Sequence, residues 1–235
     1  AFDITAAPLT ALWRDCINKK SLPSENTIKD LLSSVSGNQI ILDETNKTAK
    51  IGSGQTVDLG GIGKGYAADV AINKYKELGV NSAFINLGGN VHTLGKKIDG
   101  EPWMIGLQDP RRKRGGFIAT IAISDQSAVT SGDYEKYFET GGERYHHIID
   151  PKTGYPARTD LMSATVLSPY SVEADALSTG VFVSGLELGM ELIEKTLQAQ
   201  GILITRDDKV FVTKGLKENF YANSDGNKYK FYVYN

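Results

Sequence analysis

Four glycines and one lysine gather within six residues of this chain, in the order Gly60-Gly61-Ile62-Gly63-Lys64-Gly65. They follow a short β-type run at residues 56–59 and precede an amphipathic helix that is expected to end at Gly79. A strand that leads through glycines into a helix N-terminus brings main-chain N–H groups and the positive end of the helix dipole together. Lys64 adds a positive charge, so this stretch predicts an anion site for a phosphorylated ligand.

The loop matches neither of two common phosphate-binding patterns. Lys64 is followed by Gly65 rather than by Ser or Thr, which excludes a Walker A motif, and the glycines do not have the G-x-G-x-x-G spacing. The alternative reading is a tight turn without a ligand. Four glycines and a lysine exceed what a turn needs, so the anion site is the favoured interpretation.

A carboxylate and a hydroxyl recur on one face of a second predicted helix, at residues 172–182. Asp175 and Thr179 are four residues apart, so their side chains lie one above the other. Hard oxygen ligands of this kind suit Mg²⁺, which also takes water and substrate phosphates. The alternative is the exposed polar face of a surface helix, which Leu177, Val181 and the neighbouring alanines argue against.

All three histidines lie between residues 92 and 147, and His146 and His147 are adjacent. Neighbouring residues of a strand point to opposite faces, so one of the two is expected to point toward a site while the other packs or bonds elsewhere. Asp133, Arg144 and Asp150 are near them in the sequence. A general-base or orienting role for one histidine is therefore a reasonable hypothesis, and Asp133 is a second candidate base.

The composition of the 235 residues bounds the possible functions. The net charge of −2 and the absence of a basic cluster with interleaved aromatics give no reason to expect a nucleic-acid partner. No apolar run reaches the length of about 18 residues that a membrane helix needs. The single cysteine, Cys16, excludes an internal disulfide, and its helical spacing with Leu9, Leu12 and Trp13 predicts a buried core position.

The elements that must position these residues follow from hydrophobic periodicity and turn signals. The strand–helix–strand order from residue 56 to residue 87 predicts a crossover connection onto a sheet. The helix in this unit is expected to bury Ala67, Val70, Ala71, Tyr75 and Leu78, and the basic run at residues 111–116 is expected to be a solvated loop. Further helices are predicted at residues 8–19, 24–35 and 186–197, and strands at 40–43, 48–51, 82–87, 103–107, 117–123, 162–167, 202–204, 209–212 and 229–234.

Seven ordered motifs resemble those of the ApbE family of FAD:protein FMN transferases. In family order they are Phe2-Asp3-Ile4-Thr5 with Pro8-Leu9 and Leu12-Trp13; residues 58–67; Asn86-Leu87-Gly88-Gly89-Asn90; Gln108-Asp109-Pro110; residues 130–135; residues 145–151 with Thr153-Gly154-Tyr155-Pro156; and residues 174–179. The resemblance implies an α+β (mixed α/β) fold of two closely packed halves, with the nucleotide site between them, in a single domain over residues 1–235.

The resemblance also implies an activity and its partners. Such a transferase moves FMN from FAD onto a threonine or serine hydroxyl of an acceptor protein and releases AMP, with Mg²⁺ as cofactor. Two alternative functions would use the same site: an FAD diphosphatase that gives FMN and AMP, and a non-enzymatic FAD-binding carrier. Phosphoryl-type transfer needs the diphosphate charge neutralised and a base near the incoming hydroxyl, which agrees with the residues identified above.

Site roles follow from the resemblance position by position. Asp175, Thr179 and the main-chain carbonyl of Gly61 correspond to Mg²⁺ ligands. A catalytic histidine falls on His147 or His146, with His147 favoured. Residues that resemble FAD contacts are Ala1, Phe2, Asp3, Asp58, Lys64, Ile148 and Ile149.

Family members usually carry several dozen residues before the Phe2-Asp3-Ile4-Thr5 motif, including further flavin-ring contacts. The chain is therefore expected to be a processed or truncated form that lacks the N-terminal part of the family domain. The resemblance also implies an exported protein, in the bacterial periplasm or at the outer face of the cytoplasmic membrane. A membrane association is expected only through an N-terminal lipid anchor of the full-length protein.

Overall fold

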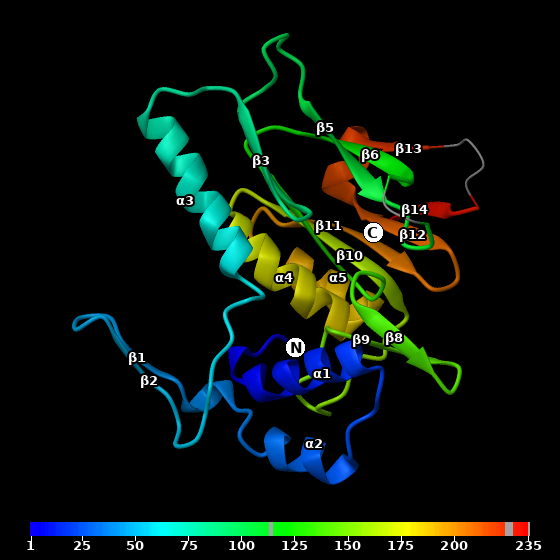
Figure 1. The fold of residues 1–235 in the computed structure, drawn as a ribbon. Helices are drawn as coiled ribbons and strands as arrows, with labels where there is room; N and C mark the ends of the chain where they lie inside the picture. Colours follow the sequence, from blue (N-terminus) through cyan, green and yellow to red (C-terminus); the bar gives the residue numbers. More distant parts are fainter. Residues whose placement is uncertain (113–114, 224–227, 235) are drawn as a thin grey trace. The chain divides into compact units, whose positions relative to one another are not determined.

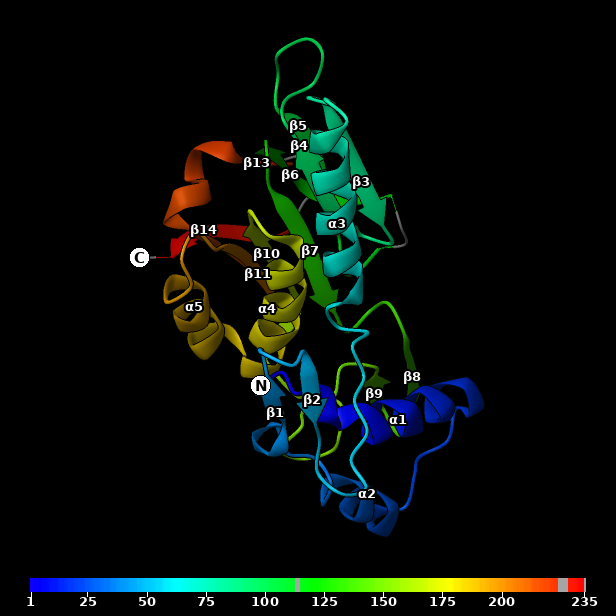
Figure 2. The ribbon, with the colours of Figure 1, turned by 90° about the vertical axis from the view of Figure 1, so that its left-hand side faces the viewer.

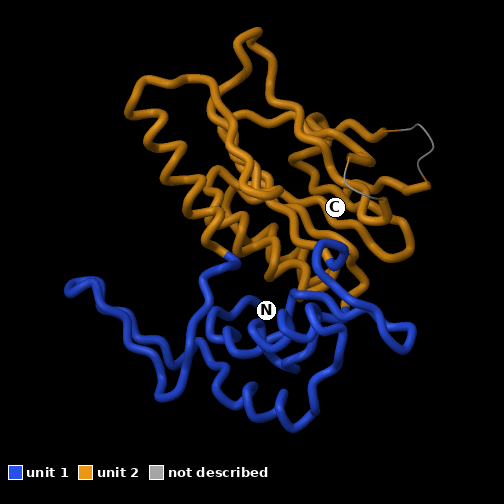
Figure 3. The backbone as a smooth tube through the Cα atoms, viewed as in Figure 1, with its two compact units in different colours: residues 1–61, 133–158 blue, residues 62–132, 159–235 orange. Residues whose placement is uncertain are grey.

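The computed structural model describes residues 1–112, 115–223 and 228–234. The chain divides into two compact units, residues 1–61 with 133–158 and residues 62–132 with 159–235 (Figure 3). Each unit is assembled from two separate stretches of sequence. The glycine–lysine loop is divided between them, because Gly61 is the last residue of the first stretch of unit 1 and Lys64 belongs to unit 2.

The two α-helices of unit 1 are those that the periodicity predicts, and only α2 is shorter than expected. Helix α2 begins where expected because the Ser24 side chain accepts a hydrogen bond from the main-chain N–H of Thr27 at 3.1 Å. It ends three residues early, since the Ser33 and Ser34 hydroxyls bond back to main-chain carbonyls and compete with the helical pattern. The helical elements are η1 (Ile4–Ala6), α1 (Ala7–Lys19), α2 (Glu25–Leu32) and η2 (Gly37–Gln39).

Two antiparallel hairpins complete unit 1. The first, β1 (Ile41–Asp43) with β2 (Thr48–Lys50), confirms the predicted pair, and the second joins β8 (Tyr137–Thr140) to β9 (Glu143–His146). Helix α1 packs its apolar stripe against this second hairpin, and the Trp13 indole N–H donates to the Gly154 carbonyl at 2.8 Å. The core that results contains Leu9, Trp13, Cys16, Ile28, Phe138 and Ile149, which confirms the buried position predicted for Cys16.

Unit 2 is built on a seven-stranded sheet with the order β14-β12-β11-β10-β7-β4-β3. All neighbouring strands are antiparallel except β12 and β14, which are parallel. The strands are β3 (Ala83–Leu87), β4 (Asn90–Leu94), β7 (Ser127–Gly132), β10 (Leu161–Ser168), β11 (Gln200–Thr205), β12 (Lys209–Thr213) and β14 (Lys230–Tyr234). The predicted hairpin of β11 and β12 and the predicted last strand are confirmed.

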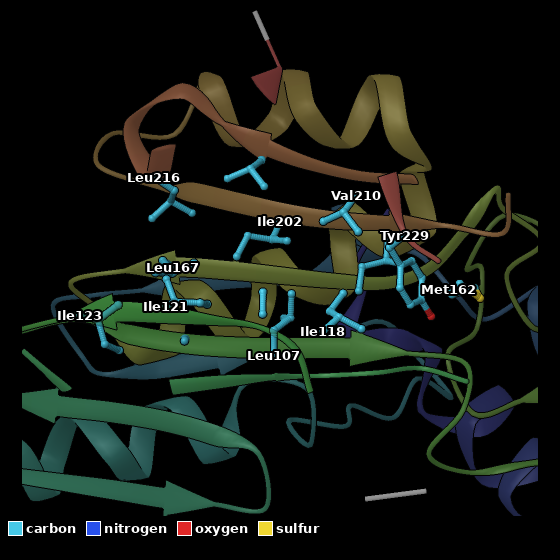
Figure 4. Packing of buried hydrophobic residues seen from close by; sticks show 14 residues of the cluster. Leu107, Ile118, Ile121, Ile123, Met162, Leu167, Ile202, Val210, Leu216 and Tyr229 are labelled. Atoms are coloured by element: carbon cyan, nitrogen blue, oxygen red, sulfur yellow. The ribbon is translucent and has the colours of Figure 1, made fainter. Parts of the chain in front are cut away.

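The two faces of this sheet are covered differently. Helices α3 (Gly63–Glu77), α4 (Ser171–Ser184) and α5 (Leu186–Glu194) lie over one face, with α3 beside α4 in both views (Figures 1 and 2). A three-stranded sheet covers the other face: β5 (Trp103–Gln108), β6 (Phe117–Ile123) and β13 (Phe220–Ala222), which follows the 3₁₀ turn η3 (Lys214–Asn219). The main core lies between the two sheets, where Ile121 and Leu167 are both buried (Figure 4).

The expected strand at residues 56–59 and the crossover connection were wrong. Residues 56–59 have no strand pairing, and β3 instead turns back through Gly88 and Gly89 into the antiparallel strand β4. Both glycines have positive φ, 65° and 98°, which non-glycine residues adopt with strain. The sheet that receives this chain segment is therefore formed by hairpins rather than by a strand–helix–strand unit.

The buried face predicted for α3 was also wrong. Gly65, Ala68 and Ile72 are buried, whereas Val70 and Leu78 are 50% and 68% exposed. Ala67 and Tyr75 are exposed too, and only Ala71 of the predicted set is half-buried. The reason is the close approach of α3 to α4 at Gly65, which places Gly65, Ala68 and Ile72 on the buried side and turns Val70 and Leu78 outward.

The basic run is more than a solvated loop at its described residues. The Arg111 guanidinium donates to Asp208 and to the Arg206 carbonyl, each at 2.7 Å, which ties the loop to the turn after β11. Lys113 and Arg114 lie outside the described residues. Within the ranges that the structure describes, no helix has the length and apolar character needed to cross a membrane.

Candidate functional site

The start of α3 is joined to the middle of α4 by a hydrogen bond between residues 110 positions apart. The main-chain N–H of Gly65 donates to Asp175 Oδ2 at 2.8 Å. A Cβ atom at position 65 would lie 2.3 Å from the Ser171 carbonyl oxygen, so only glycine allows this approach. One N–H at the helix N-terminus, the feature that predicted an anion site, thus already binds a carboxylate of the protein itself.

None of the four loop glycines has a positive φ, so the turn alone does not require them. Gly61 instead faces the ring of Phe2, because a Cβ atom there would lie 2.7 Å from Phe2 Cε2. A Cβ atom at Gly63 would meet no atom within 4 Å. Close approach therefore explains Gly61 and Gly65, and the reading of the stretch as a simple turn does not account for them.

Asp175 is a buried carboxylate with a cation beside it. Its side chain is 5% exposed, and Lys64 Nζ lies 3.7 Å from Oδ1. Burial raises the pKa of Asp175, while the Gly65 N–H and the Lys64 ammonium act to lower it. A buried carboxylate needs positive charge nearby to stay ionised. Here Oδ2 is bound to the Gly65 N–H, and Oδ1 faces the Lys64 ammonium.

Thr179 follows Asp175 by one turn of α4, as the sequence predicted, and the helix is largely buried. The Thr179 hydroxyl contacts the Ser131 hydroxyl of β7 at 3.1 Å, and Ser131 also contacts Ser178 at 2.9 Å. These contacts with β7 fix the rotation of α4 about its own axis. The side of the helix that carries Asp175 and Thr179 is therefore turned toward the protein interior. This excludes the alternative of an exposed polar helix face.

The donor set fits a hard divalent cation. Asp175 offers a carboxylate oxygen and Thr179 a hydroxyl, which are ligand types that Mg²⁺ accepts together with water. Among the described residues, no group of three or more His, Cys, Asp and Glu side chains could hold a metal, but the predicted set contains only one such side chain. Gly61, the third predicted ligand, belongs to unit 1, so its part in this set stays a prediction.

Unit 1 brings the predicted FAD contacts from the chain start and the loop together. Asp58 donates its main-chain N–H to the Ile4 carbonyl at 2.8 Å, next to the Phe2–Gly61 contact. Asp58 Oδ1 also accepts from the Gly60 N–H at 2.7 Å. Ala1 is exposed. A cavity of about 430 Å³ opens beside these residues and is lined by Phe2, Asp3, Ile4, Ser36, Gly37, Asn38 and Ile40.

Asp3 contributes to the wall of this cavity through its own hydrogen bonds. Its Oδ1 accepts from the main-chain N–H and the hydroxyl of Thr5, at 2.9 and 2.7 Å, and its Oδ2 accepts from the Gly37 N–H at 2.9 Å. Oδ1 therefore braces the turn that begins at Asp3, and Oδ2 holds the chain start to the segment at Gly37. The geometry gives Asp3 a role in shaping the cavity.

The two adjacent histidines have different surroundings. His146 is 2% exposed, with Nε2 donating to the Ala157 carbonyl at 2.9 Å and Nδ1 accepting from the Ile148 N–H at 3.3 Å. His147 lies just beyond the end of β9 and is half-buried, and its Nδ1 contacts the Lys136 carbonyl at 3.3 Å. Donation from Nδ1 selects the tautomer in which Nε2 accepts a proton. The geometry separates a structural histidine, His146, from a candidate base, His147.

The other candidates near the histidines are parts of the interior of unit 1. Asp133 is 1% exposed and pairs with Arg144 at 3.4 Å, an ion pair that the sequence did not predict. Ile148 and Ile149 are buried, and Ile149 packs in the same cluster as Trp13. Their side chains therefore serve the core.

The sequence did not predict the polar residues that surround the start of α4. Asp69 on α3 accepts from the main-chain N–H groups of Ser171 and Val172, at 2.8 and 2.9 Å, and so caps α4. His92 Nδ1 lies 3.2 Å from Asp69. No local signal could have found this cap, because more than a hundred residues separate the carboxylate from the helix that it caps.

The fold and this site define a mixed α/β protein in which a glycine-rich helix start meets a buried carboxylate. The model of the ApbE family matches residues 1–204. The FAD:protein FMN transferase of Klebsiella pneumoniae (strain 342) is 37% identical over 227 residues, which cover 96% of this chain and 70% of the relative. That of Haemophilus influenzae is 36% identical, with 91% and 63% covered. The crystal structure of the ApbE protein from Thermotoga maritima has a TM-score of 0.83 at 34% identity and covers 93% of this chain and 71% of that one.

The chain belongs to the ApbE family. It spans 63% to 70% of the length of the two relatives named above. The fold that the resemblance implied, a mixed α/β architecture, is confirmed by the helices and sheets of both units and by the structural match.

Proposed function

We propose that this chain is the transferase that its relatives are named for, and that it moves FMN from FAD onto a threonine or serine hydroxyl of an acceptor protein. The observation that carries the proposal is the buried Asp175 carboxylate, held by the Gly65 N–H and facing Lys64. Asp175 and Thr179 would hold Mg²⁺, with the Gly61 carbonyl as a third ligand. When bound, Mg²⁺ neutralises charge on the diphosphate and polarises its oxygens.

The residues of the chain have separate tasks in this reaction. The acceptor hydroxyl oxygen forms a bond to the phosphorus of the FMN half, the bond between that phosphorus and the bridging oxygen breaks, and AMP leaves with the bridging oxygen. His147 takes the hydroxyl proton at Nε2, supported by its Nδ1 contact with the Lys136 carbonyl. Lys64 offsets negative charge on the diphosphate, and the cavity beside Phe2 and Asp3 binds part of FAD.

The test is a labelling reaction with total protein from the source cells as acceptor. The purified chain is incubated with this protein, FAD and Mg²⁺, and flavin fluorescence is read after denaturing gel electrophoresis. We expect a fluorescent band that is absent with Asp175→Asn and present with Asp99→Asn, a matched control whose carboxylate is 60% exposed. FMN and AMP without a band would indicate an FAD diphosphatase, and intact FAD would indicate a carrier.

We also propose that the protein works outside the cytoplasmic membrane, as the family resemblance implies. The support is the resemblance alone, including the expected N-terminal lipid anchor of the full-length form. Fractionation of the source cells with immunodetection tests this location. Detection only in the cytoplasmic fraction would contradict it.

A further inference from the structure

Helices α3 and α4 are joined at two places by the same type of contact. At the first, the Asp175 carboxylate of α4 accepts from the main-chain N–H of Gly65, in the first turn of α3, at 2.8 Å. At the second, the Asp69 carboxylate of α3 accepts from the N–H groups of Ser171 and Val172, the first two residues of α4, at 2.8 and 2.9 Å. Each helix therefore binds the start of the other with an aspartate.

The two contacts are one helical turn apart on both helices. Gly65 and Asp69 are four residues apart on α3, and Ser171 and Asp175 are four residues apart on α4. The order is opposite on the two helices, since the earlier residue of α3 binds the later residue of α4. A shift of α4 along α3 would break both contacts, so together they fix the position of one helix along the other.

The Asp69 side chain is itself held in place. It is 17% exposed, and His92 Nδ1 of β4 lies 3.2 Å from its Oδ1. Within the described part of the chain, Tyr170 at the N-cap position of α4 makes no side-chain cap hydrogen bond, so the first N–H groups of α4 depend on Asp69. The first turn of α4 also lies directly against α3, because a Cβ atom at Gly65 would be 2.3 Å from the Ser171 carbonyl oxygen.

The candidate cation ligands are on the following turns of the same helix. Asp175 Oδ2 is bound to the Gly65 N–H, and Oδ1 lies 3.7 Å from Lys64 Nζ. A movement of α4 would carry Asp175 and Thr179 together, because both side chains project from one hydrogen-bonded helix. The position of the first turn of α4 therefore decides where the carboxylate and the hydroxyl lie relative to the start of α3.

We propose that Asp69 is a positioning residue that holds the first turn of α4 against α3 and thereby places Asp175 and Thr179 for a divalent cation. This inference rests on the proposed function, because it assumes that these two residues are metal ligands. Residues that orient metal ligands typically change metal affinity by about 10- to 100-fold when they are removed. Asp69 acts through a helical turn and not on a ligand directly, so the expected effect is at the low end of this range.

The test measures binding of Mn²⁺, as a paramagnetic substitute for Mg²⁺, to the chain without FAD. We expect Asp69→Ala to raise the Kd for Mn²⁺ by about tenfold. Asp69→Asn is expected to raise it less, because the amide keeps one oxygen acceptor but replaces the other with a donor. This partial rescue by the conservative variant is specific to a positioning role.

Asp160→Ala is the matched control. Asp160 Oδ1 accepts from the main-chain N–H of Leu186 at 3.1 Å and so binds the start of α5, a helix that carries no candidate ligand. Urea denaturation is expected to show a loss of stability in both Asp69→Ala and Asp160→Ala. Only Asp69→Ala is expected to change the Kd, which is measured without urea on the folded variants.

Two results would overturn the inference. One is an unchanged Kd in folded Asp69→Ala, which would leave Asp69 as a cap that only stabilises α4. The other is an equal rise of the Kd in Asp160→Ala, which would assign the effect to a general loss of stability. If Asp69→Ala does not fold, an unchanged Kd in Asp69→Asn has the same meaning as the first result.

Asp175→Ala distinguishes a failure of this inference from a failure of the proposed function. If it abolishes Mn²⁺ binding while Asp69→Ala does not weaken it, only the role of Asp69 is wrong. If Asp175→Ala binds Mn²⁺ as the unmodified chain does, the metal assignment of the proposed function is wrong, and the role of Asp69 fails with it.

Discussion

The main-chain N–H of Gly65 and the carboxylate of Asp175 are joined by a 2.8 Å hydrogen bond across 110 residues of sequence. This contact links the two stretches that sequence reasoning had identified separately, the glycine–lysine loop and the Asp175–Thr179 helix face. It also explains why α3 buries Gly65 and Ala68 near its start, because the helices must approach closely for a main-chain group of one to reach a short side chain of the other. The contact makes the glycine a structural requirement.

Gly65→Ala is expected to destabilise unit 2. The added Cβ would lie 2.3 Å from the Ser171 carbonyl oxygen, and a backbone atom cannot move aside as a flexible side chain can. Overpacking of this kind costs about 1–3 kcal/mol of the free energy of unfolding. Urea denaturation measures the change.

Gly63→Ala is the control for this prediction, since Gly63 begins the same helix and has no atom within 4 Å of an added Cβ. Alanine favours the helix over glycine by up to about 1 kcal/mol, so stability is expected to stay equal or to rise. Equal losses in the two variants would show that the close contact with α4 is not the cause.

His147→Ala and His146→Ala are expected to fail in different ways. Removal of a general base lowers turnover by about 10²- to 10⁴-fold, and His147 is half-buried, so its loss leaves stability nearly unchanged. His146→Ala leaves the Ala157 carbonyl and the Ile148 N–H without their partner, at about 1–3 kcal/mol of stability. Steady-state kinetics and urea denaturation of both variants measure this separation. A folded, inactive His146→Ala beside an active His147→Ala would reverse the two roles.

Stability is expected to fall below neutral pH because of His92. Burial lowers its pKa from 6.5, and this outweighs the raising influence of Asp69 and Asp125, while Lys76 adds to the lowering. The unfolded chain therefore binds a proton at this residue at a higher pH than the folded chain does. The contribution is complete above the unfolded pKa and is lost as the pH falls from 6.5 toward the folded pKa.

Thermal unfolding between about pH 7.5 and about pH 5.5 measures this effect. His92→Gln is expected to flatten the slope of stability against pH in this range, because glutamine has no proton to gain. The slope above about pH 7 serves as the internal control and should not change. An unaltered slope in the variant throughout the range would assign the pH dependence to other groups.

Cys16 is expected to react slowly with a thiol reagent in the folded protein. Its side chain is 6% exposed, and burial raises the pKa of the thiol, so little reactive thiolate is present and access is blocked. Titration with a chromogenic disulfide should detect almost no thiol in buffer and one per chain in denaturant, in agreement with the single cysteine. A full and rapid reaction of the folded protein would contradict the burial of α1 on its core.

The sequence by itself determined most of the helices, several of the strands and the pairing of two polar side chains on α4. Helical periodicity located α1, α2 and α4, alternating and continuous apolar runs located the hairpins β1–β2 and β11–β12, and the Ser24 cap was readable locally. Asp175 and Thr179 could be paired from their spacing alone, because the helical repeat fixes which side chains share a face. The ordered motifs were enough to indicate the ApbE family.

Only the tertiary structure decided how these elements are paired and what surrounds the site. The face that α3 buries depends on its partner α4, and local hydrophobicity gave the wrong face, since a close helix contact prefers Gly65 and Ala68 to Val70 and Leu78. The difference between His146 and His147 depends on carbonyls of other segments. The Asp69 cap is likewise a contact between residues far apart in sequence, which periodicity and spacing do not encode.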